Sequence, residues 1–217
     1  MVGKYIAIEG PDGAGKTTQL KLLAKAFEQA QLKYITVREP GGTDVGKQLR
    51  EILLTGHADK MDGVMEALLF SADRRHTAMT ITKPSLEKGM FVLSDRTYLT
   101  TMVFQGYGRG LNRDILETLT QIAIDTIRPD LMVVLDVDEQ TSLQRKGVQA
   151  QAGLQEIRFE SMGESFHARN RKGYLSEAAK NSETYWVLDA SQGMEAIHHS
   201  IVAEINQRFG LNLQAVI

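Results

Sequence analysis

Gly10-Pro11-Asp12-Gly13-Ala14-Gly15-Lys16-Thr17 fits the pattern G-x-x-x-x-G-K-[ST] near the start of the chain. Residues 4–9 before it are a short apolar run, and residues 17–31 after it carry apolar side chains at helical spacing. In a strand–loop–helix unit the glycines let the backbone turn tightly, so that successive N–H groups point at a phosphate. Given ordinary glycine usage, chance matches occur in on the order of one chain in a hundred of this length. The pattern therefore predicts a phosphate-binding loop at the start of a helix.

Two side chains at the end of this loop add specific chemistry. Lys16 brings a positive charge to the β- and γ-phosphates of a nucleoside triphosphate, and the Thr17 hydroxyl can ligate Mg²⁺. We therefore expect ATP to be bound by the loop and the residue after it: Gly10, Pro11, Asp12, Gly13, Ala14, Gly15, Lys16, Thr17 and Thr18. The loop alone leaves the reaction open, because GTPases, ATPases and small kinases share it.

Further apolar runs and helical patterns indicate the fold class. Four runs predict strands after the first: 34–37, 91–93, 131–135 and 185–188. Helical patterns predict the segments that accompany them: 45–54, 61–82, 164–179 and 194–209. Since parallel strands need helical crossovers, this order predicts an α/β, three-layer fold in which helices cover both faces of a five-stranded parallel sheet. The length suits a single domain over residues 1–217.

Polar residues follow the predicted strands, at the edge where open α/β sheets bind ligands. They are Glu9, Glu39, Asp95, Asp136 and Asp189. Glycines also gather at Gly41-Gly42 and from Gly106 to Gly110, where we expect tight loops.

Composition excludes several classes of function. The chain has no cysteine, which excludes disulfides, thiolate catalysis and Cys-based metal sites. Its net charge of -2 lacks the basic excess of a nucleic-acid-binding protein. The longest apolar runs are far shorter than the roughly 20 residues of a membrane span, and the N-terminal residues do not form a signal peptide. We expect a cytoplasmic protein with no membrane and no nucleic-acid partner.

Motifs outside the loop narrow the class further. A GTPase would carry an Asp-x-x-Gly switch and an Asn-Lys-x-Asp guanine reader, and neither occurs beyond the loop itself. Several arginines instead follow the predicted strands, which indicates a second anionic ligand. A small phosphotransferase therefore fits better than a nucleotide-controlled switch or a motor ATPase.

Seven segments, in order over residues 4–209, resemble those of the thymidylate kinase family, the ATP:dTMP phosphotransferases. The segments are 9–18 (EGPDGAGKTT), 38–43 (REPGGT), 70–74 (FSADR), 95–96 (DR), 105–110 (QGYGRG), 128–131 (RPDL) and 135–137 (LDV). The resemblance implies in-line transfer of the ATP γ-phosphoryl group to dTMP, giving dTDP for dTTP synthesis. Another nucleoside monophosphate kinase or a deoxynucleoside kinase is the nearest alternative.

The resemblance also implies roles for residues that would bind dTMP. Asp12 would accept a hydrogen bond from the 3′-hydroxyl, and Arg38 and Arg96 would bind the 5′-phosphate. Phe70 would stack on thymine and Arg74 would donate to a thymine carbonyl. Core packing is the alternative interpretation of Phe70, and a solvated helix face that of Arg74.

Further acceptor-site residues follow from the segment after Asp95-Arg96. Thr100 and Thr101 are candidates to bind the pyrimidine N3 edge, and Gln105 completes the predicted dTMP site. Phe104 stands where the family often has a tyrosine beside the sugar, so the ring can still disfavour a 2′-hydroxyl but lacks the phenol oxygen.

Catalysis is expected to need neither a general base nor a thiol. A phosphate dianion is already a nucleophile at neutral pH because the second pKa of a phosphate monoester lies near 6. The resemblance implies Lys16, Arg96 and Asp12 as catalytic residues, and Mg²⁺ bound by Thr17 and Asp95.

Residues 146–155 have no large apolar side chains apart from Val148 and Leu154, which predicts a mobile segment, and the segment over about 145–158 resembles the family's LID. In one branch of the family an arginine lies inside the phosphate-binding loop, whereas in the other the LID supplies it. Gly13 occupies that place here, so Arg158 becomes the catalytic arginine, with a surface position as the alternative. The resemblance further implies a homodimer formed through helices, for which residues 61–82 have enough apolar side chains.

Overall fold

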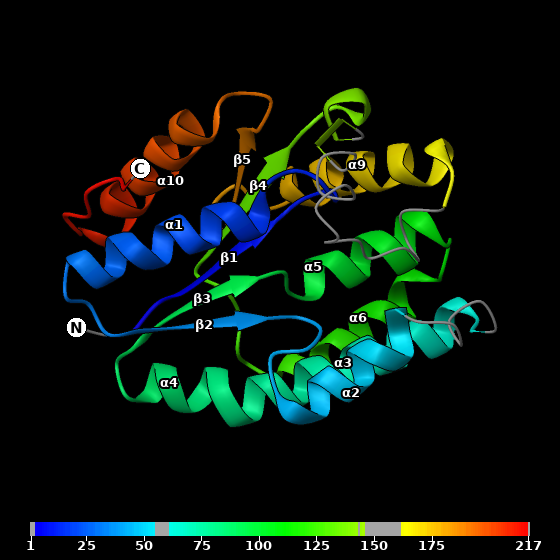
Figure 1. Cartoon of the computed structure of the whole chain (residues 1–217). Helices are drawn as coiled ribbons and strands as arrows, with labels where there is room; N and C mark the ends of the chain where they lie inside the picture. Colours follow the sequence, from blue (N-terminus) through cyan, green and yellow to red (C-terminus); the bar gives the residue numbers. More distant parts are fainter. Residues whose placement is uncertain (1–2, 55–60, 143, 146–161, 217) are drawn as a thin grey trace.

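The computed structural model describes residues 3–54, 61–142, 144–145 and 162–216. Its centre is a sheet of five parallel strands in the order β2-β3-β1-β4-β5 (Figure 1). The strands are β1 (Tyr5–Glu9), β2 (Tyr34–Arg38), β3 (Phe91–Asp95), β4 (Leu131–Asp136) and β5 (Tyr185–Asp189). The predicted five-stranded parallel sheet is therefore confirmed, and each strand ends within two residues of its apolar run.

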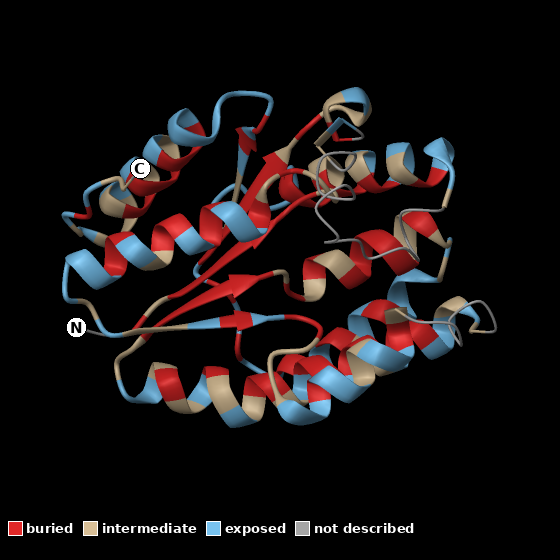
Figure 2. Ribbon diagram, in the orientation of Figure 1, coloured by how far each residue is buried: buried red, intermediate tan, exposed pale blue. Residues whose placement is uncertain are grey.

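Successive side chains of β1 enter different cores, because side chains alternate between the two faces of a strand. Ile6 and Ile8 belong to the cluster that includes Phe27 of α1 (Lys16–Gln29) and Ile201 of α10 (Met194–Phe209). Ala7 belongs to a second cluster, on the opposite face of the sheet. Figure 2 shows that the three central strands, β1, β3 and β4, are almost wholly buried between these layers, whereas the edge strands β2 and β5 are partly exposed.

Helices on the second face are more numerous. They are α2 (Asp44–Leu54), α3 (Gly63–Thr77), η2 (Ala78–Thr82), α4 (Lys83–Glu87), α5 (Tyr98–Thr101), η3 (Met102–Gly108), α6 (Arg113–Ile124) and α9 (Glu164–Ala178). Both faces of the sheet are thus covered, which confirms the three-layer prediction. Across the described ranges, no helix combines the length and the apolar character of a membrane span.

The helix predicted over residues 61–82 is longer and less regular than its pattern indicates. Asp62 caps α3 by accepting a hydrogen bond from the Met65 N–H at 2.7 Å. The chain then continues through the π-helical η2 into α4, which begins with Lys83 and Pro84. Pro84 has no N–H to donate to the preceding turn, and it lies where the π-helical geometry of η2 gives way to α4.

The loop expected at Gly106–Gly110 is largely wrong. Residues 102–108 form the π-helical η3, which continues directly from α5. A Cβ atom at Gly108 would lie 2.4 Å from Phe166 Cε2 and 2.6 Å from Asn170 Oδ1. Glycine at position 108 therefore allows close packing of η3 against α9, and among the expected loop residues only the last two lie beyond the helix.

The register of the strand pairing brings the polar residues at the strand ends to one edge of the sheet. Ile8 pairs with Asp95, Arg38 also pairs with Asp95, and Asp136 pairs with Asp189. The carboxyl ends of all five strands consequently meet at one edge of the sheet, next to the loop that follows β1 (Figure 1).

Candidate active site

The loop after β1 has the backbone that its glycines predict. Gly10, Gly13 and Gly15 all have positive φ, a backbone conformation that residues with a Cβ atom rarely adopt. At Gly10 a Cβ would also lie 2.4 Å from the Leu135 carbonyl oxygen. Helix α1 begins directly after the loop, so its unpaired N–H groups and positive dipole end face the loop. This geometry suits a bound phosphate group.

Lys16 begins α1 and is 7 % exposed. Its Nζ donates a hydrogen bond to the Pro11 carbonyl oxygen at 2.6 Å and lies 3.9 Å from Asp12 Oδ1. Burial, and then the positive charge of Arg96, lower the pKa of Lys16 to about 8, while the charge of Asp12 opposes the shift. The ammonium group is thus poised beside the loop where an anion would stabilise its charge.

Thr17 and Asp95 meet between α1 and the end of β3. The Thr17 hydroxyl donates to Asp95 Oδ2 at 2.6 Å, and Asp95 is 3 % exposed. A hydroxyl and a carboxylate oxygen are hard ligands of the kind that Mg²⁺ prefers. The two residues predicted to bind Mg²⁺ therefore lie together, and their donor atoms fit that ion.

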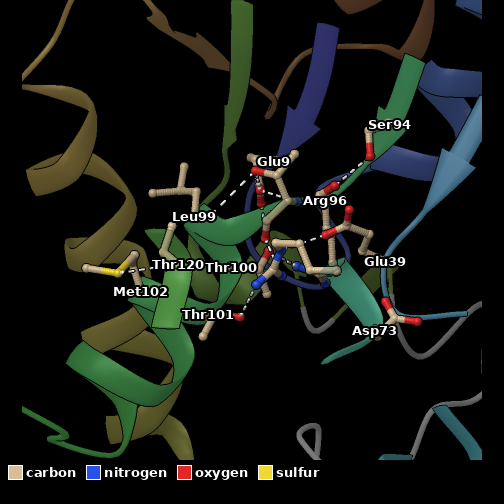
Figure 3. A network of polar contacts seen from close by, with 12 residues as sticks. Glu9, Glu39, Asp73, Ser94, Arg96, Leu99, Thr100, Thr101, Met102 and Thr120 are labelled. Atoms are coloured by element: carbon tan, nitrogen blue, oxygen red, sulfur yellow. Dashed lines mark hydrogen bonds and ion pairs between the residues drawn. The ribbon is translucent and has the colours of Figure 1, made fainter. Parts of the chain in front are cut away.

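Arg96 joins the loop to the start of α5. Its φ is +73°, an unusual conformation for a residue with a side chain, and such outliers concentrate at functional sites. Nη2 is ion-paired with Asp12 Oδ1 in the loop. Nη1 donates to Thr100 Oγ1 at 3.2 Å (Figure 3). It also donates to Tyr174 Oη at 3.3 Å and to Gly10 O at 3.4 Å.

Glu9 lies close to this arginine at the end of β1 and is fully buried. Its Oε1 accepts from the Thr97 N–H at 2.6 Å and the Thr97 hydroxyl at 2.8 Å, and its Oε2 accepts from the Thr100 hydroxyl at 2.7 Å (Figure 3). Burial raises the pKa of Glu9, while the Thr100 hydrogen bond and the charge of Arg96 favour the ionised form. Sequence reasoning placed Glu9 at the edge but gave it no partners.

Arg74 is buried rather than solvated, so the surface interpretation of this residue is wrong. Its side chain is 3 % exposed, and its Nε donates to Glu39 Oε2 at 2.7 Å. Nη1 donates to Thr101 Oγ1 at 3.1 Å and Nη2 to the Thr97 carbonyl oxygen at 2.9 Å. Burial raises the pKa of Glu39 to about 7, although the charge of Arg74 opposes that shift.

The two neighbouring threonines consequently have different surroundings. Thr101 contacts Arg74, whereas Thr100 contacts Arg96 and Glu9. Their adjacent positions in α5 turn the two hydroxyls toward different guanidinium groups.

Three other predicted acceptor residues line the same region from α3 and η3. Phe70 is 7 % exposed and packs in the second core cluster, which also includes Phe104. The Arg96 guanidinium lies 5.5 Å from the centre of the Phe104 ring. Gln105 is buried, and its Nε2 donates to Glu66 Oε2 at 3.1 Å. The substrate contacts predicted for these residues stay predictions.

Arg38 and Arg50 bring two more cations to this edge. Arg38 ends β2 and is exposed, whereas Arg50 of α2 is partly buried and donates to the Pro40 carbonyl oxygen at 2.6 Å. Burial, and then the positive charges of Arg38 and Arg96, lower the pKa of Arg50 to about 10. Three like charges that repel one another in this way provide a site for an anion. Sequence reasoning missed Arg50, because a single arginine in a helical pattern looks like a solvated surface residue.

The predicted LID arginine cannot be placed. Arg158 lies outside the described residues, as does the rest of 146–161. Of the predicted LID, Arg145 is described, and it donates to the Gln192 carbonyl oxygen at 3.3 Å. After the gap, α9 is tied to the sheet edge, because Arg171 donates to both carboxylate oxygens of Asp136 at 2.7 and 2.8 Å.

Comparisons with known proteins agree with this geometry. The family model for thymidylate kinase matches residues 8–201. The chain is 39 % identical to a thymidylate kinase of Pelotomaculum thermopropionicum over 202 residues, 93 % of this chain and 92 % of the relative. It is 38 % identical to one of Maridesulfovibrio salexigens, covering 94 % and 95 %.

A solved structure shows the same likeness. The crystal structure of thymidylate kinase from Ehrlichia chaffeensis superposes with a TM-score of 0.75 at 28 % identity, covering 94 % of this chain and 99 % of that one. Fold, loop and sequence relatives agree: the chain belongs to the thymidylate kinase family and phosphorylates dTMP to dTDP.

Proposed function

We propose that the phosphoryl donor is ATP with Mg²⁺, bound by residues 10–18. The observation that carries this proposal is the position of Arg96, which contacts Gly10 and Asp12 on the loop and Thr100 on the acceptor side. A cation between two anionic ligands is what transfer between two phosphate groups requires. Thr17 and Asp95 would hold Mg²⁺, which when bound would neutralise charge on the phosphate oxygens.

We further propose that dTMP lies across α3, α5 and η3. Arg38, Arg50 and Arg96 would bind its 5′-phosphate, because guanidinium groups match phosphate oxygens in pairs. Arg74 and Thr101 would bind the base edge, since they contact each other and are buried. In this proposal Thr100 binds Arg96 and does not contact the base.

The remaining acceptor contacts carry over from the sequence. Phe70 would stack on the base, Gln105 would contact the base edge, and Phe104 would exclude a ribose 2′-hydroxyl. Asp12 would accept the hydrogen bond of the 3′-hydroxyl while it stays paired with Arg96.

The transfer itself would be an in-line displacement. An oxygen of the dTMP phosphate forms a bond to the γ-phosphorus as the bond from that phosphorus to the bridging oxygen of ADP breaks. The dianion needs no general base, so the protein positions the two nucleotides and neutralises charge. Lys16 and Arg96 would supply that charge, with Arg158 as a third cation.

A substrate panel tests the acceptor, and a loop variant tests the donor site. With ATP, dTMP should be phosphorylated faster than dUMP, dCMP, AMP, GMP or thymidine. Lys16→Ala should lower kcat/KM by about 10³-fold, because a buried charge at the transferring group is lost. A Lys16→Ala enzyme with nearly full activity would refute the donor site.

We also propose a homodimer formed through α2, α3 and α6. Large apolar side chains are exposed on these neighbouring helices: Val45, Ile52, Val64, Met65, Leu68, Ile115 and Ile122. An apolar surface of this extent indicates a protein interface. Leu68→Glu should give a monomer in sedimentation equilibrium, whereas the control Met194→Glu, on the exposed start of α10, should leave the dimer intact. A dimer that survives Leu68→Glu would argue against this face.

A further inference from the structure

Tyr174 is a buried residue to which neither the sequence pattern nor the proposed mechanism gives a role. It lies on α9, is 1 % exposed, and is the largest of the fully buried side chains in the described part of the chain. Its position in the helix fits an ordinary core residue, and its ring packs in the second cluster with Phe104 and Phe166. The hydroxyl, however, reaches out of that cluster to Arg96 and Thr100.

The direction of these hydrogen bonds follows from the number of protons. The Thr100 hydroxyl has one proton, and it donates that proton to Glu9 Oε2 at 2.7 Å. Tyr174 Oη lies 3.1 Å from Thr100 Oγ1, so the phenol must be the donor in that pair. Its oxygen is then left to accept from Arg96 Nη1 at 3.3 Å. With Glu9 ionised, the result is a directed chain from Arg96 through Tyr174 and Thr100 to Glu9.

This chain of hydrogen bonds holds one side of the Arg96 guanidinium group. Nη1 is held by Thr100 and Tyr174, while Nη2 is directed at Asp12 in the phosphate-binding loop. A guanidinium that is fixed through one nitrogen needs little reordering before it binds a phosphate through others. A chain that runs from a cation to an anion also strengthens each of its hydrogen bonds.

We propose that Tyr174 is a positioning residue for phosphoryl transfer, whose hydroxyl holds Arg96 in place from helix α9. The proposal rests on the proposed contact of Arg96 with phosphoryl groups. It gives α9 a part in the acceptor site through a single phenol oxygen.

Tyr174→Phe tests this role, because it removes the hydroxyl and keeps the ring. Loss of a hydrogen bond to a charged group should lower kcat/KM for dTMP by about 10- to 100-fold. KM for ATP should change less than about twofold, because the loop glycines and Lys16 are untouched. A merely structural role would lower the urea midpoint and leave both kinetic constants near those of the wild type, and that result would overturn the proposal.

Tyr107→Phe is the matched control. Tyr107 lies on η3 and its hydroxyl also bonds α9, donating to Ser176 Oγ at 3.1 Å and Glu177 Oε1 at 2.8 Å. Those bonds are remote from Arg96 in the network, so this variant should lose stability but keep kcat/KM for dTMP within about twofold. Equal losses of kcat/KM for dTMP in both tyrosine variants would show that the packing of α9, rather than the hydrogen bonds to Arg96, determines activity.

A double-mutant cycle tests whether Tyr174 and Glu9 act through one chain of hydrogen bonds. Glu9→Gln places an amide N–H₂ or C=O where the carboxylate accepts two threonine hydroxyls, which disrupts the direction of the bonds. If the residues act as one unit, Tyr174→Phe should lower kcat/KM much less in the Glu9→Gln background than in the wild type. If the two losses in kcat/KM simply multiply in the double variant, Tyr174 and Glu9 act independently, which would contradict the chain of hydrogen bonds.

Arg96→Met separates this inference from the proposed function. An active Arg96→Met enzyme would refute the role of Arg96 itself. An inactive Arg96→Met enzyme beside a fully active Tyr174→Phe enzyme would overturn the role of Tyr174 alone.

Discussion

Glu39→Gln should change the pH dependence of folding in a defined direction. Glu39 is 4 % exposed and accepts a hydrogen bond from Arg74 Nε at 2.7 Å, and burial raises its pKa from an ordinary value of 4.5 to about 7. The folded protein keeps the carboxyl proton up to about pH 7, whereas the unfolded chain releases it near 4.5. Raising the pH through this window therefore costs the folded protein stability.

The magnitude follows from the pKa difference. One pKa unit corresponds to about 1.4 kcal/mol, so between pH 5 and pH 8 wild-type stability should fall by about 2–3 kcal/mol relative to Glu39→Gln. Glutamine does not titrate, and its unfolding curve therefore lacks this contribution. Urea unfolding of both proteins at pH 5, 6, 7 and 8, with the slope checked for two-state behaviour, measures the difference.

A surface pair provides the control for this measurement. Glu117 lies 2.6 Å from Arg113, but its side chain is 53 % exposed. Glu117→Gln should follow the wild-type curve at a constant and small offset. If Glu39→Gln also keeps a constant offset from pH 5 to pH 8, the Arg74 charge outweighs burial and the reasoning is refuted.

Three further predictions concern activity. Burial lowers the pKa of Lys16 to about 8, so kcat/KM for ATP should fall above about pH 8 as the free enzyme loses this charge. Lys16→Arg should move this decline to higher pH. A decline that stays at the same pH in Lys16→Arg would assign it to another group. Phe104→Ala should raise the ratio of kcat/KM for UMP to that for dTMP, and an unchanged ratio would remove Phe104 from the sugar pocket. Arg158→Ala should lower kcat at least about tenfold, because an arginine at the transferring phosphoryl group is worth about 10³-fold or more; a smaller loss in single-turnover measurements would exclude it.

The fold could be predicted where its signals are local. The phosphate-binding loop and the apolar runs depend on a few adjacent residues, and all five strands were found from them. The π-helix η3 was missed, because its geometry depends on tertiary packing. Gly108 and Gly173 allow η3 and α9 to approach closely, and without the partner helix Gly108 looks like a loop residue.

The site could be predicted where residues belong to the phosphate-binding loop, follow a strand or lie in a segment that resembles the family. Thr17 and Asp95 were paired in advance because the family resemblance implies that both bind one Mg²⁺ ion, and the two side chains do lie together. Arg50 and Tyr174 could not be recognised in this way. Each lies within a helix, where an arginine predicts solvent and a tyrosine predicts core, and their roles depend on which neighbours the fold brings within 3.5 Å.

Paired charges explain how a chain with a net charge of -2 can hold so many cations at one edge. Asp12, which is partly exposed, lies against Arg96, and two buried carboxylates, Glu39 and Glu66, lie against Arg74 and Arg109. Buried pairs of this kind add little stability, because desolvation offsets the attraction between the charges. Their benefit is geometric, since a guanidinium that a carboxylate already orients can bind a nucleotide without first being ordered. Replacing Arg74 and Glu39 together by apolar residues of similar volume should therefore preserve or raise stability while kcat/KM for dTMP falls, the separation expected if these charges serve catalysis rather than folding.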